Sequence, residues 1–269
     1  MVYCRCARRR AALRTVMPVS NAIPPSLDQA AAPGPSSFAA SRRGGQIRAI
    51  SYGGAPAEAG RDSSRLPCGW VLDGGLRLFR GDGARVGRSA AALKLLLALA
   101  VTAEEDGSAL LSCAQLAALA GLTQSLIVSG KRLLADYGLV RVEAEGRRTR
   151  LALTRYGPDH RAARIRHDPA YRANPAAEIR GLRALSCRRS GHLDALKLYI
   201  LLCALAGEEG AREGAQGGPV ALPAGLAADL LNLTILRLSA ALALLRDQGL
   251  AELGDARPDM LLARPLPLP

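Results

Sequence analysis

Aromatic residues are scarce in this sequence: two Phe, six Tyr and one Trp make up 3% of 269 residues. Proteins that bind single-stranded nucleic acid without sequence preference stack successive bases on aromatic rings, so this composition disfavours that class. Lysine is scarce as well, because only Lys94, Lys131 and Lys197 occur among 36 basic residues. Arginine therefore carries almost all of the positive charge, and a GC-rich coding composition accounts for part of that excess.

The sequence also lacks the common catalytic motifs. It contains no Walker loop, no G-x-S-x-G and no H-E-x-x-H. A nicking enzyme would need a catalytic tyrosine with a histidine cluster, and Tyr156 before His160 and His167 is the nearest approach. Six scattered cysteines match no zinc-binding spacing. We therefore expect a non-enzymatic protein without a cofactor or a metal site.

Long hydrophobic runs are absent too. The longest, residues 90–101, contains Lys94 and falls short of the ~20 residues that a membrane-spanning helix needs. The N-terminal segment is rich in arginine and poor in acidic residues, which fits a transit peptide or a true start at Met17. It has no apolar core of the kind found in secretion signals. We expect a cytoplasmic protein that does not bind membranes.

What the sequence does have is a large positive charge, distributed unevenly. The net charge is +13 and the pI is about 10.2, which favours a polyanionic partner such as nucleic acid. Residues 1–64 carry 9 basic and 3 acidic residues, residues 65–157 carry 13 and 8, and residues 158–192 carry 8 and 3. Residues 193–269 carry 6 and 9, so the C-terminal part alone is acidic.

Composition and local patterns divide the chain into segments. Residues 1–64 are rich in Ala, Pro, Gly, Ser and Arg without a sustained period, which predicts a disordered basic tail. Residues 65–84 alternate apolar and polar side chains around Asp73-Gly74-Gly75, which predicts a short β-hairpin. Residues 158–189 read as a basic linker with a short helix starting at Asn174-Pro175. That linker either follows phosphates or is a solvated connection.

Residues 85–157 show a regular succession of elements. Leu93, Leu96 and Leu97 recur at helical spacing. A short extended stretch follows, then a helix capped by Ser112 and a second helix with Thr123 at its N-cap. Two short strands around Gly146 complete the segment. The predicted order is helix, strand, helix, helix, strand, strand.

The same succession occurs again in residues 190–265. The motif Ala-Leu-Lys-Leu at 92–95 returns at 195–198, an offset of 103 residues. Residues 122–140 return as 233–251, an offset of 111 that matches Leu-Thr at the start and Gly-Leu at the end. A Gly-rich insertion at 207–219 accounts for the difference between the offsets. This internal repeat indicates two copies of one unit.

The stretch LSCAQLAALAGLTQSLIVSGKRLLADYGLV, residues 111–140, resembles the helix-turn-helix core of bacterial winged-helix proteins. Its tandem copy is similar to the arrangement in mobile-element replication initiators and in some transcription regulators. The resemblance implies a mainly α fold with small β wings, comprising two tandem winged-helix domains at 85–157 and 190–265. Lys131 departs from the pattern, because that position is usually apolar; its stem can lie along the core.

The two copies differ in the residues expected to face outward. In the first copy, polar side chains that can contact base edges and phosphates are Thr123, Gln124, Ser125, Ser129 and Arg132, with Arg147, Arg148 and Arg150 in the wing. In the second copy, the corresponding face is apolar and suits a protein interface: Ile235, Leu236 and Ala240.

These observations lead to one hypothesis and one alternative. The hypothesis is a protein that binds double-stranded DNA through domain 1, regulating transcription or initiating replication, and that self-associates or binds a protein partner through domain 2. The alternative is a scaffold or chromosome-organisation protein that uses both winged helices for protein contacts. The basic first copy favours the hypothesis, because a scaffold does not need it.

Overall fold

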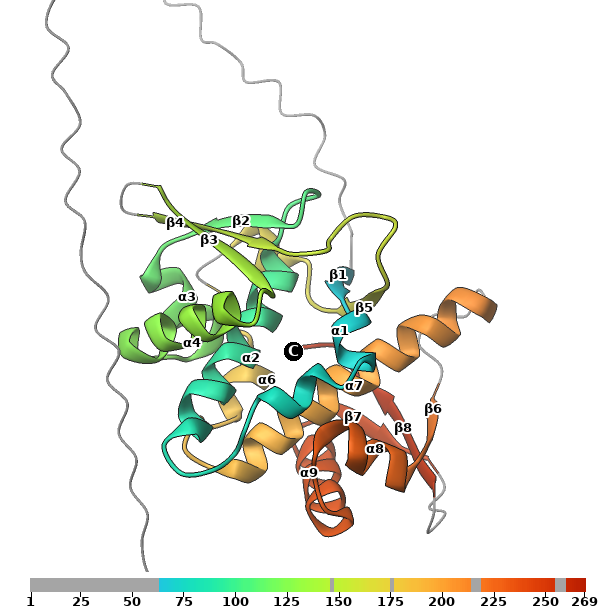
Figure 1. The fold of residues 1–269 in the computed structure, drawn as a ribbon. Helices are drawn as coiled ribbons and strands as arrows, with labels where there is room; N and C mark the ends of the chain where they lie inside the picture. The colour runs from blue at the N-terminus through green and yellow to red at the C-terminus, as the bar shows by residue number, and fades with distance from the viewer. Residues whose placement is uncertain (1–62, 146–147, 175–176, 214–218, 255–259) are drawn as a thin grey trace, which may run out of the picture. The chain divides into compact units, whose positions relative to one another are not determined.

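The computed structural model describes residues 63–145, 148–174, 177–213, 219–254 and 260–269. Within these ranges the fold is mainly helical with small antiparallel sheets, which confirms the general fold class (Figure 1). The predicted tail, residues 1–64, lies outside the described residues except for Ser63 and Ser64, which begin strand β1.

The N-terminal module is the run of elements from α2 to β4. Its bounds are α2 (Arg85–Thr102), β2 (Ser108–Leu111), α3 (Cys113–Ala120), α4 (Gln124–Asp136), β3 (Val140–Glu145) and β4 (Arg148–Leu153). The strands form a sheet in the order β2-β4-β3. Both predicted N-cap positions are confirmed. Ser112 forms a capping box with Gln115, whereas Thr123 occupies the N-cap of α4 without a side-chain capping bond.

The C-terminal module runs from α7 to β8 and repeats this order. Its bounds are α7 (Ser190–Glu213), β6 (Val220–Pro223), α8 (Ala224–Leu231), α9 (Ile235–Asp247), β7 (Ala251–Leu253) and β8 (Met260–Pro265). Its sheet order, β6-β8-β7, corresponds strand for strand to that of the N-terminal module. Left-handed backbone recurs 111 residues apart as well, at Gly121 and Asn232 and at Gly138 and Gly249.

A buried lysine occupies the same place in each module. Lys94 is 1% exposed and its Nζ donates to the carbonyl oxygen of Ala120, the last residue of α3, at 3.2 Å. Lys197 is 3% exposed and its Nζ donates to the carbonyl oxygen of Leu231, the last residue of α8, also at 3.2 Å. Each lysine thus satisfies a carbonyl that the helix end leaves without an intrahelical partner. The repeated Ala-Leu-Lys motif therefore has a structural role in each module.

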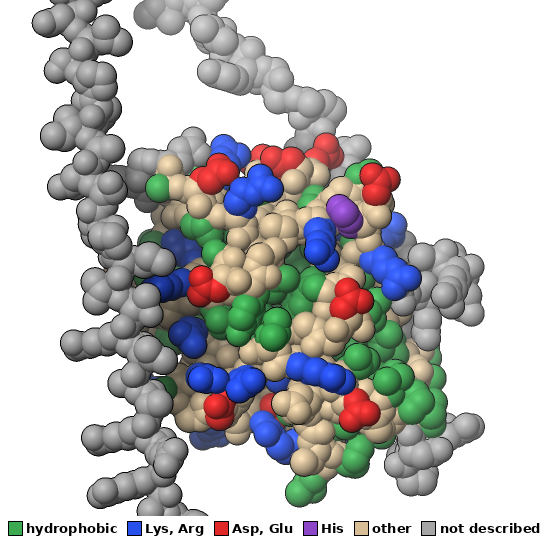
Figure 2. Space-filling model, in the orientation of Figure 1, with side chains coloured by type: hydrophobic (Ala, Val, Ile, Leu, Met, Phe, Trp, Pro, Cys, Tyr) green, Lys and Arg blue, Asp and Glu red, His purple; other side chains and the backbone are tan. Residues whose placement is uncertain are grey.

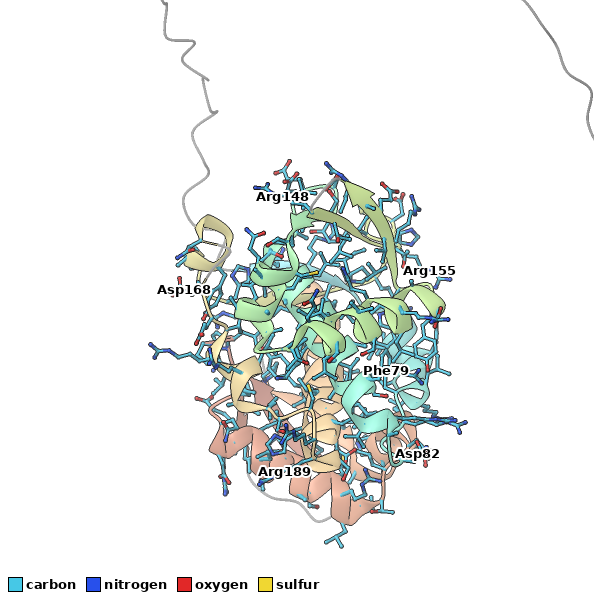
Figure 3. The ribbon with its side chains drawn as sticks, turned by 90° about the vertical axis from the view of Figure 1, so that its left-hand side faces the viewer. Phe79, Asp82, Arg148, Arg155, Asp168 and Arg189 are labelled. Atoms are coloured by element: carbon cyan, nitrogen blue, oxygen red, sulfur yellow. The ribbon has the colours of Figure 1, made fainter. Side chains whose placement is uncertain are left out.

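The expected hairpin over residues 65–84 is wrong. After β1 (Ser63–Pro67), the chain forms α1 (Gly69–Leu72) and the 3-10 helix η1 (Gly75–Leu78). Gly74 does make a turn, with φ 79°, but the turn joins two short helices. Val71, Leu76 and Phe79 are all fully buried, so the apolar side chains of the segment face the core. Figure 3 labels Phe79 in this segment.

Of the two alternatives for residues 158–189, the solvated connection is wrong. Its strand β5 (Ala162–Arg166) pairs with β1, and it then forms α5 (Ala170–Ala173) and α6 (Arg180–Ala184). The predicted helix start at Asn174 is not where α6 begins, since Ile179 is its N-cap. The apolar side chains of 179, 182 and 185 are fully buried. Their burial makes this segment part of the core.

The two modules share one core. Helices α2 and α7 pack against each other, and almost every side chain from Ser89 to Val101 is buried. The 18-residue stretch Ser190–Gly207 of α7 is, by length and composition alone, apolar enough to cross a membrane. In this fold 72% of that stretch is buried inside the protein. It packs against the rest of its own module and against α2 of the N-terminal module.

Candidate nucleic-acid interface

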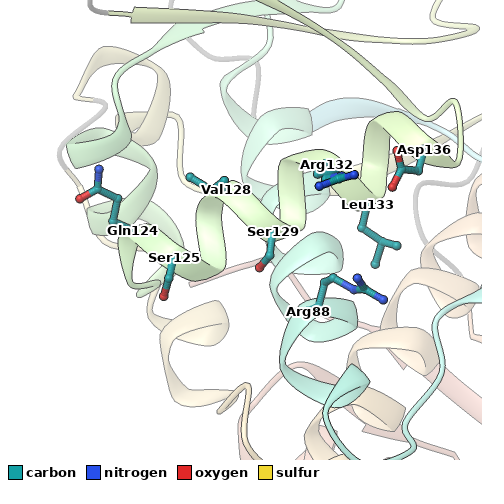
Figure 4. A pocket seen from close by; sticks show the side chains of 8 residues that line it. All are labelled: Arg88, Gln124, Ser125, Val128, Ser129, Arg132, Leu133 and Asp136. Atoms are coloured by element: carbon teal, nitrogen blue, oxygen red, sulfur yellow. The ribbon is translucent and has the colours of Figure 1, made fainter.

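The outer face of α4 borders an open groove with a volume of about 750 Å³ (Figure 4). Four of the side chains predicted to contact DNA line it: Gln124, Ser125, Ser129 and Arg132. Val128, Leu133, Asp136 and Arg88 complete the lining. The structure thus brings the predicted helix residues together on one accessible surface.

Packing of the opposite face of α4 explains why these residues point outward. Ile127, Gly130 and Leu134 are buried against α2. A Cβ at Gly130 would lie 2.8 Å from Leu95 Cδ1 and 3.1 Å from the backbone nitrogen of Ala92, so the two helices approach closely here. Because this face of α4 is held against α2, the 3.6-residue period of the helix places the polar groove residues on the opposite, outward side. Thr123 is exposed at the N-terminus, with its hydroxyl 3.2 Å from that of Ser125.

Arg88 is a groove residue that sequence reasoning missed. It lies in the first turns of α2, 36 positions before Gln124, and is exposed. No local pattern marks it, because only the crossing of α2 and α4 brings its guanidinium to the groove. The groove therefore presents two arginines, Arg88 and Arg132, against the single carboxylate of Asp136. Its charge favours an anionic partner.

The arginines of the predicted wing are not equivalent. Arg147 lies outside the described residues. Arg148 is exposed at the start of β4, and Figure 3 shows it at the outer end of the β3–β4 hairpin. Arg150 is half-buried, donates to the hydroxyl of Ser108 at 3.3 Å and lies opposite Glu143 in the sheet. Arg150 is therefore engaged within the fold, and Arg148 is the better placed of the two to reach a partner.

The three apolar residues predicted on the outer face of α9 are exposed, beside the exposed Arg237 and Ser239. Ile235 is 49% exposed, Leu236 is 79% exposed, and Ala240 is also exposed. In the N-terminal turn of α9, Arg237 forms a two-pronged ion pair with Asp194 of α7, with both nitrogen–oxygen distances at 2.9 Å. Burial raises the pKa of Asp194, and the bonds from Arg237 act against that rise. Burial also lowers the pKa of nearby Lys197 to about 8.

One buried pair elsewhere has the composition of a nucleophile and its base. Ser64 Oγ lies 2.6 Å from Nε2 of His167, whose Nδ1 lies 3.0 Å from the carbonyl oxygen of Asp168. Both side chains are only 3% exposed, so we assign the pair a structural role in joining β1 to the segment after β5. Among the described residues, no group of three or more His, Cys, Asp or Glu side chains is arranged to hold a metal ion.

No protein-family model, curated protein or solved structure matches this chain.

Proposed function

We propose that this chain is a non-enzymatic protein that binds double-stranded DNA through the groove face of α4. The observation that carries the proposal is the exposed Gln124, Ser125 and Arg132 on that face, with Arg88 of α2 beside them. Ser129 also lines the groove, but it is half-buried and its hydroxyl donates to the carbonyl oxygen of Leu126. Its role is the regulation of transcription or the initiation of replication.

The local architecture supports two tandem winged-helix domains. Helices α3 and α4 meet at 94°, and α8 and α9 at 91°, within the range of DNA-binding helix-turn-helix motifs. In each module two paired strands follow the second helix, which is the place of a wing. The shared element order, sheet order and lysine cap argue for two copies of the same domain.

In such a motif the second helix enters the major groove, and its N-terminal residues contact base edges. Gln124 suits adenine and Arg132 suits guanine, since their side chains offer the matching donors and acceptors. Arg88 and Arg148 flank the helix and suit phosphates, which position a protein without reading sequence. The backbone N–H groups at the start of α4 add a further phosphate contact.

The C-terminal module contributes a different surface to the proposed function. Its exposed Ile235 and Leu236 lack hydrogen-bonding groups, and its segment of the chain is acidic. Apolar side chains without charge resemble the core of a protein interface. We therefore assign self-association, or binding of a protein partner, to α9.

The test is fluorescence anisotropy of the full chain with labelled random-sequence duplex DNA over a range of salt concentrations. The variant Arg88→Gln with Arg132→Gln should bind more weakly than wild type, and its log–log salt slope should fall by about 0.9 for the phosphate contact assigned to Arg88. The matched control, Arg246→Gln with Arg264→Gln, removes the same charge from the C-terminal module and should leave the slope nearly unchanged.

Two results would count against the proposal. Absence of binding by the wild-type chain at low salt would favour the scaffold alternative, in which both modules contact proteins. An equal loss of affinity in the two double variants would show that net charge alone, rather than the α4 groove, governs binding.

A further inference from the structure

A second cavity, of about 400 Å³, lies beyond the C-terminal end of α4. Five parts of the chain line it: Pro67, Gly69 and Trp70 around β1 and α1, Leu96 of α2, residues 137–139 just after α4, residues 153–155 at the end of β4 and the loop 159–161. Its volume falls within the range of small-molecule sites, which is roughly 300–1,000 Å³. The proposed DNA contact uses none of these residues.

The inner wall of this cavity is apolar and aromatic. Trp70 and Tyr137 lie beside Leu96, Leu139 and Leu153. The polar atoms of the two aromatic side chains are already bonded: Trp70 Nε1 donates to the carbonyl oxygen of Pro67 at 2.9 Å, and the Tyr137 hydroxyl donates to that of Leu78 at 3.0 Å. This wall can therefore make only apolar and aromatic contacts with a ligand.

The remaining lining is polar and mostly basic. Arg155, His160 and Arg161 lie there with one carboxylate, Asp159, and all four residues are exposed. Figure 2 shows hydrophobic side chains at the centre of this face, with basic side chains and a histidine nearby. An apolar wall beside an excess of positive charge suits a ligand with one apolar part and one negative group.

The backbone holds Arg155 in a conformation that L-residues rarely adopt. Its φ is 55°, and the only other non-glycine residue with positive φ in the described part of the chain is Asn232, which ends a helix. The hydroxyl of the preceding residue, Thr154, donates to the carbonyl oxygen of Gly138, in the turn after α4, at 2.6 Å. Such unfavourable backbone clusters at ligand sites when the surrounding structure enforces it.

We propose that this cavity binds a small aromatic carboxylate. The ring lies against Trp70 and Tyr137, where stacked or edge contacts are favourable. The carboxylate lies at the basic end, where the planar guanidinium of Arg155 can make a charge-assisted, two-pronged bond. Inorganic phosphate would leave the apolar wall uncovered, and a neutral aromatic compound could not make the charge-assisted bond to Arg155. Binding does not depend on the proposed DNA function.

Trp70 makes the proposal directly measurable, because it is the only tryptophan in the sequence. Full-length protein is titrated with phenylacetate while the tryptophan emission is recorded, and phenylacetamide serves as the neutral probe of the same shape. We expect a saturable change with phenylacetate and about tenfold weaker binding of the amide, because the amide cannot form the charge-assisted bond.

The variant Arg155→Gly tests the basic end without endangering the fold, since glycine accepts a φ of 55° readily. It should weaken phenylacetate binding about tenfold while thermal unfolding shows an intact protein, and Arg155→Lys should recover part of the affinity. Arg180→Gln, at an exposed arginine of α6, is the control and should bind as wild type does.

Three results would each overturn the proposal. They are the absence of a saturable response to phenylacetate, equal affinity for the amide, and undiminished affinity in Arg155→Gly. Duplex binding measured on the same preparations reports on the DNA proposal separately.

Discussion

The N-terminal and C-terminal modules place the same elements in the same order but present different surfaces. At an offset of 111 residues, Gln124 corresponds to Ile235, Ser125 to Leu236, Ser129 to Ala240 and Arg132 to Ala243. Arg88 corresponds to Gly191 at the offset of 103. Those replacements change nearly every polar side chain of the α4 groove into an apolar one.

Buried positions of the two modules changed much less. Lys94 and Lys197 make the same helix-end bond, and Ile127 and Leu134 correspond to Leu238 and Leu245, all four of them buried. Core positions constrain volume and hydrogen bonding tightly, whereas exposed positions away from special features tolerate change at little cost. The two modules therefore differ mainly on their surfaces, which is where the proposed DNA and protein contacts lie.

The largest effect should follow from breaking a contact that exists only in the C-terminal module. Arg237 and Asp194 correspond to Leu126 and Ala91 in the N-terminal module. Replacing Arg237 with Leu leaves the carboxylate of Asp194, whose side chain is 3% exposed, without its partner. We expect a loss of about 3 kcal/mol in urea unfolding, at the low end for such pairs because 44% of the Arg237 side chain is exposed.

The double variant Asp194→Ala with Arg237→Leu, which copies the N-terminal module, should recover most of that stability. Arg246→Leu controls for the removal of a surface arginine. Equal destabilisation by the single and double variants would contradict the role assigned to the ion pair.

The next effect concerns the apolar face of α9. Leu236→Glu places a charge on a surface proposed to bind a second copy or a partner. A residue central to an interface typically contributes about 2 kcal/mol or more. Sedimentation of the full chain should therefore show association weakened by tenfold or more, with duplex affinity per chain unchanged. Leu78→Glu, at another exposed leucine (53%), should leave association as in wild type.

A pH effect on stability should follow from the burial of Lys197. Burial lowers the pKa of Lys197 to about 8 from an ordinary 10.5, so the unfolded chain holds this proton more firmly than the folded one. Unfolding free energy should therefore rise between about pH 8 and pH 10.5 on account of this group. Lys197→Met should lose that contribution when urea unfolding is compared across this range. A wild-type-like pH dependence in the variant would show that Lys197 is not the group responsible.

The smallest effect concerns the wing. Arg148→Gln should lower the log–log salt slope of duplex binding by about 0.9, the value for one phosphate contact. Arg150→Gln should change the slope less, because Arg150 already donates to Ser108. A larger change from Arg150 than from Arg148 would reverse our assignment of these two residues.

Helix positions were the most predictable part of this molecule. The N-caps at Ser112 and Thr123 and the outward face of α4 followed from spacing alone, because caps and a 3.6-residue period are local properties. The local nature of these signals also explains why the hairpin predicted around residues 69–78 was wrong. A turn at Gly74 is compatible with flanking strands or flanking helices, and burial of Val71 and Leu76 decided between them.

In residues 158–189, by contrast, the structure depends on contacts with distant parts of the chain. Its many arginines suggested solvent, but Ile179 is fully buried and its N–H donates to the carbonyl oxygen of Leu119 in α3. Strand β5 pairs with β1 across a sequence separation of about 100 residues, as in Ser63 opposite Arg166. Pairing at such a distance leaves no periodic signal within either segment.

The class of the fold, the repeated order of elements and the contrast between the polar residues of α4 and the apolar residues of α9 could all be predicted from the sequence. These features rest on side-chain period, capping and charge along short stretches of chain. The tertiary structure alone decided that Arg88 joins the α4 groove, that Arg150 is engaged by Ser108 and that a cavity forms beside Trp70. Each of these depends on segments brought together by packing of the shared core, and no local stretch of sequence contains that information.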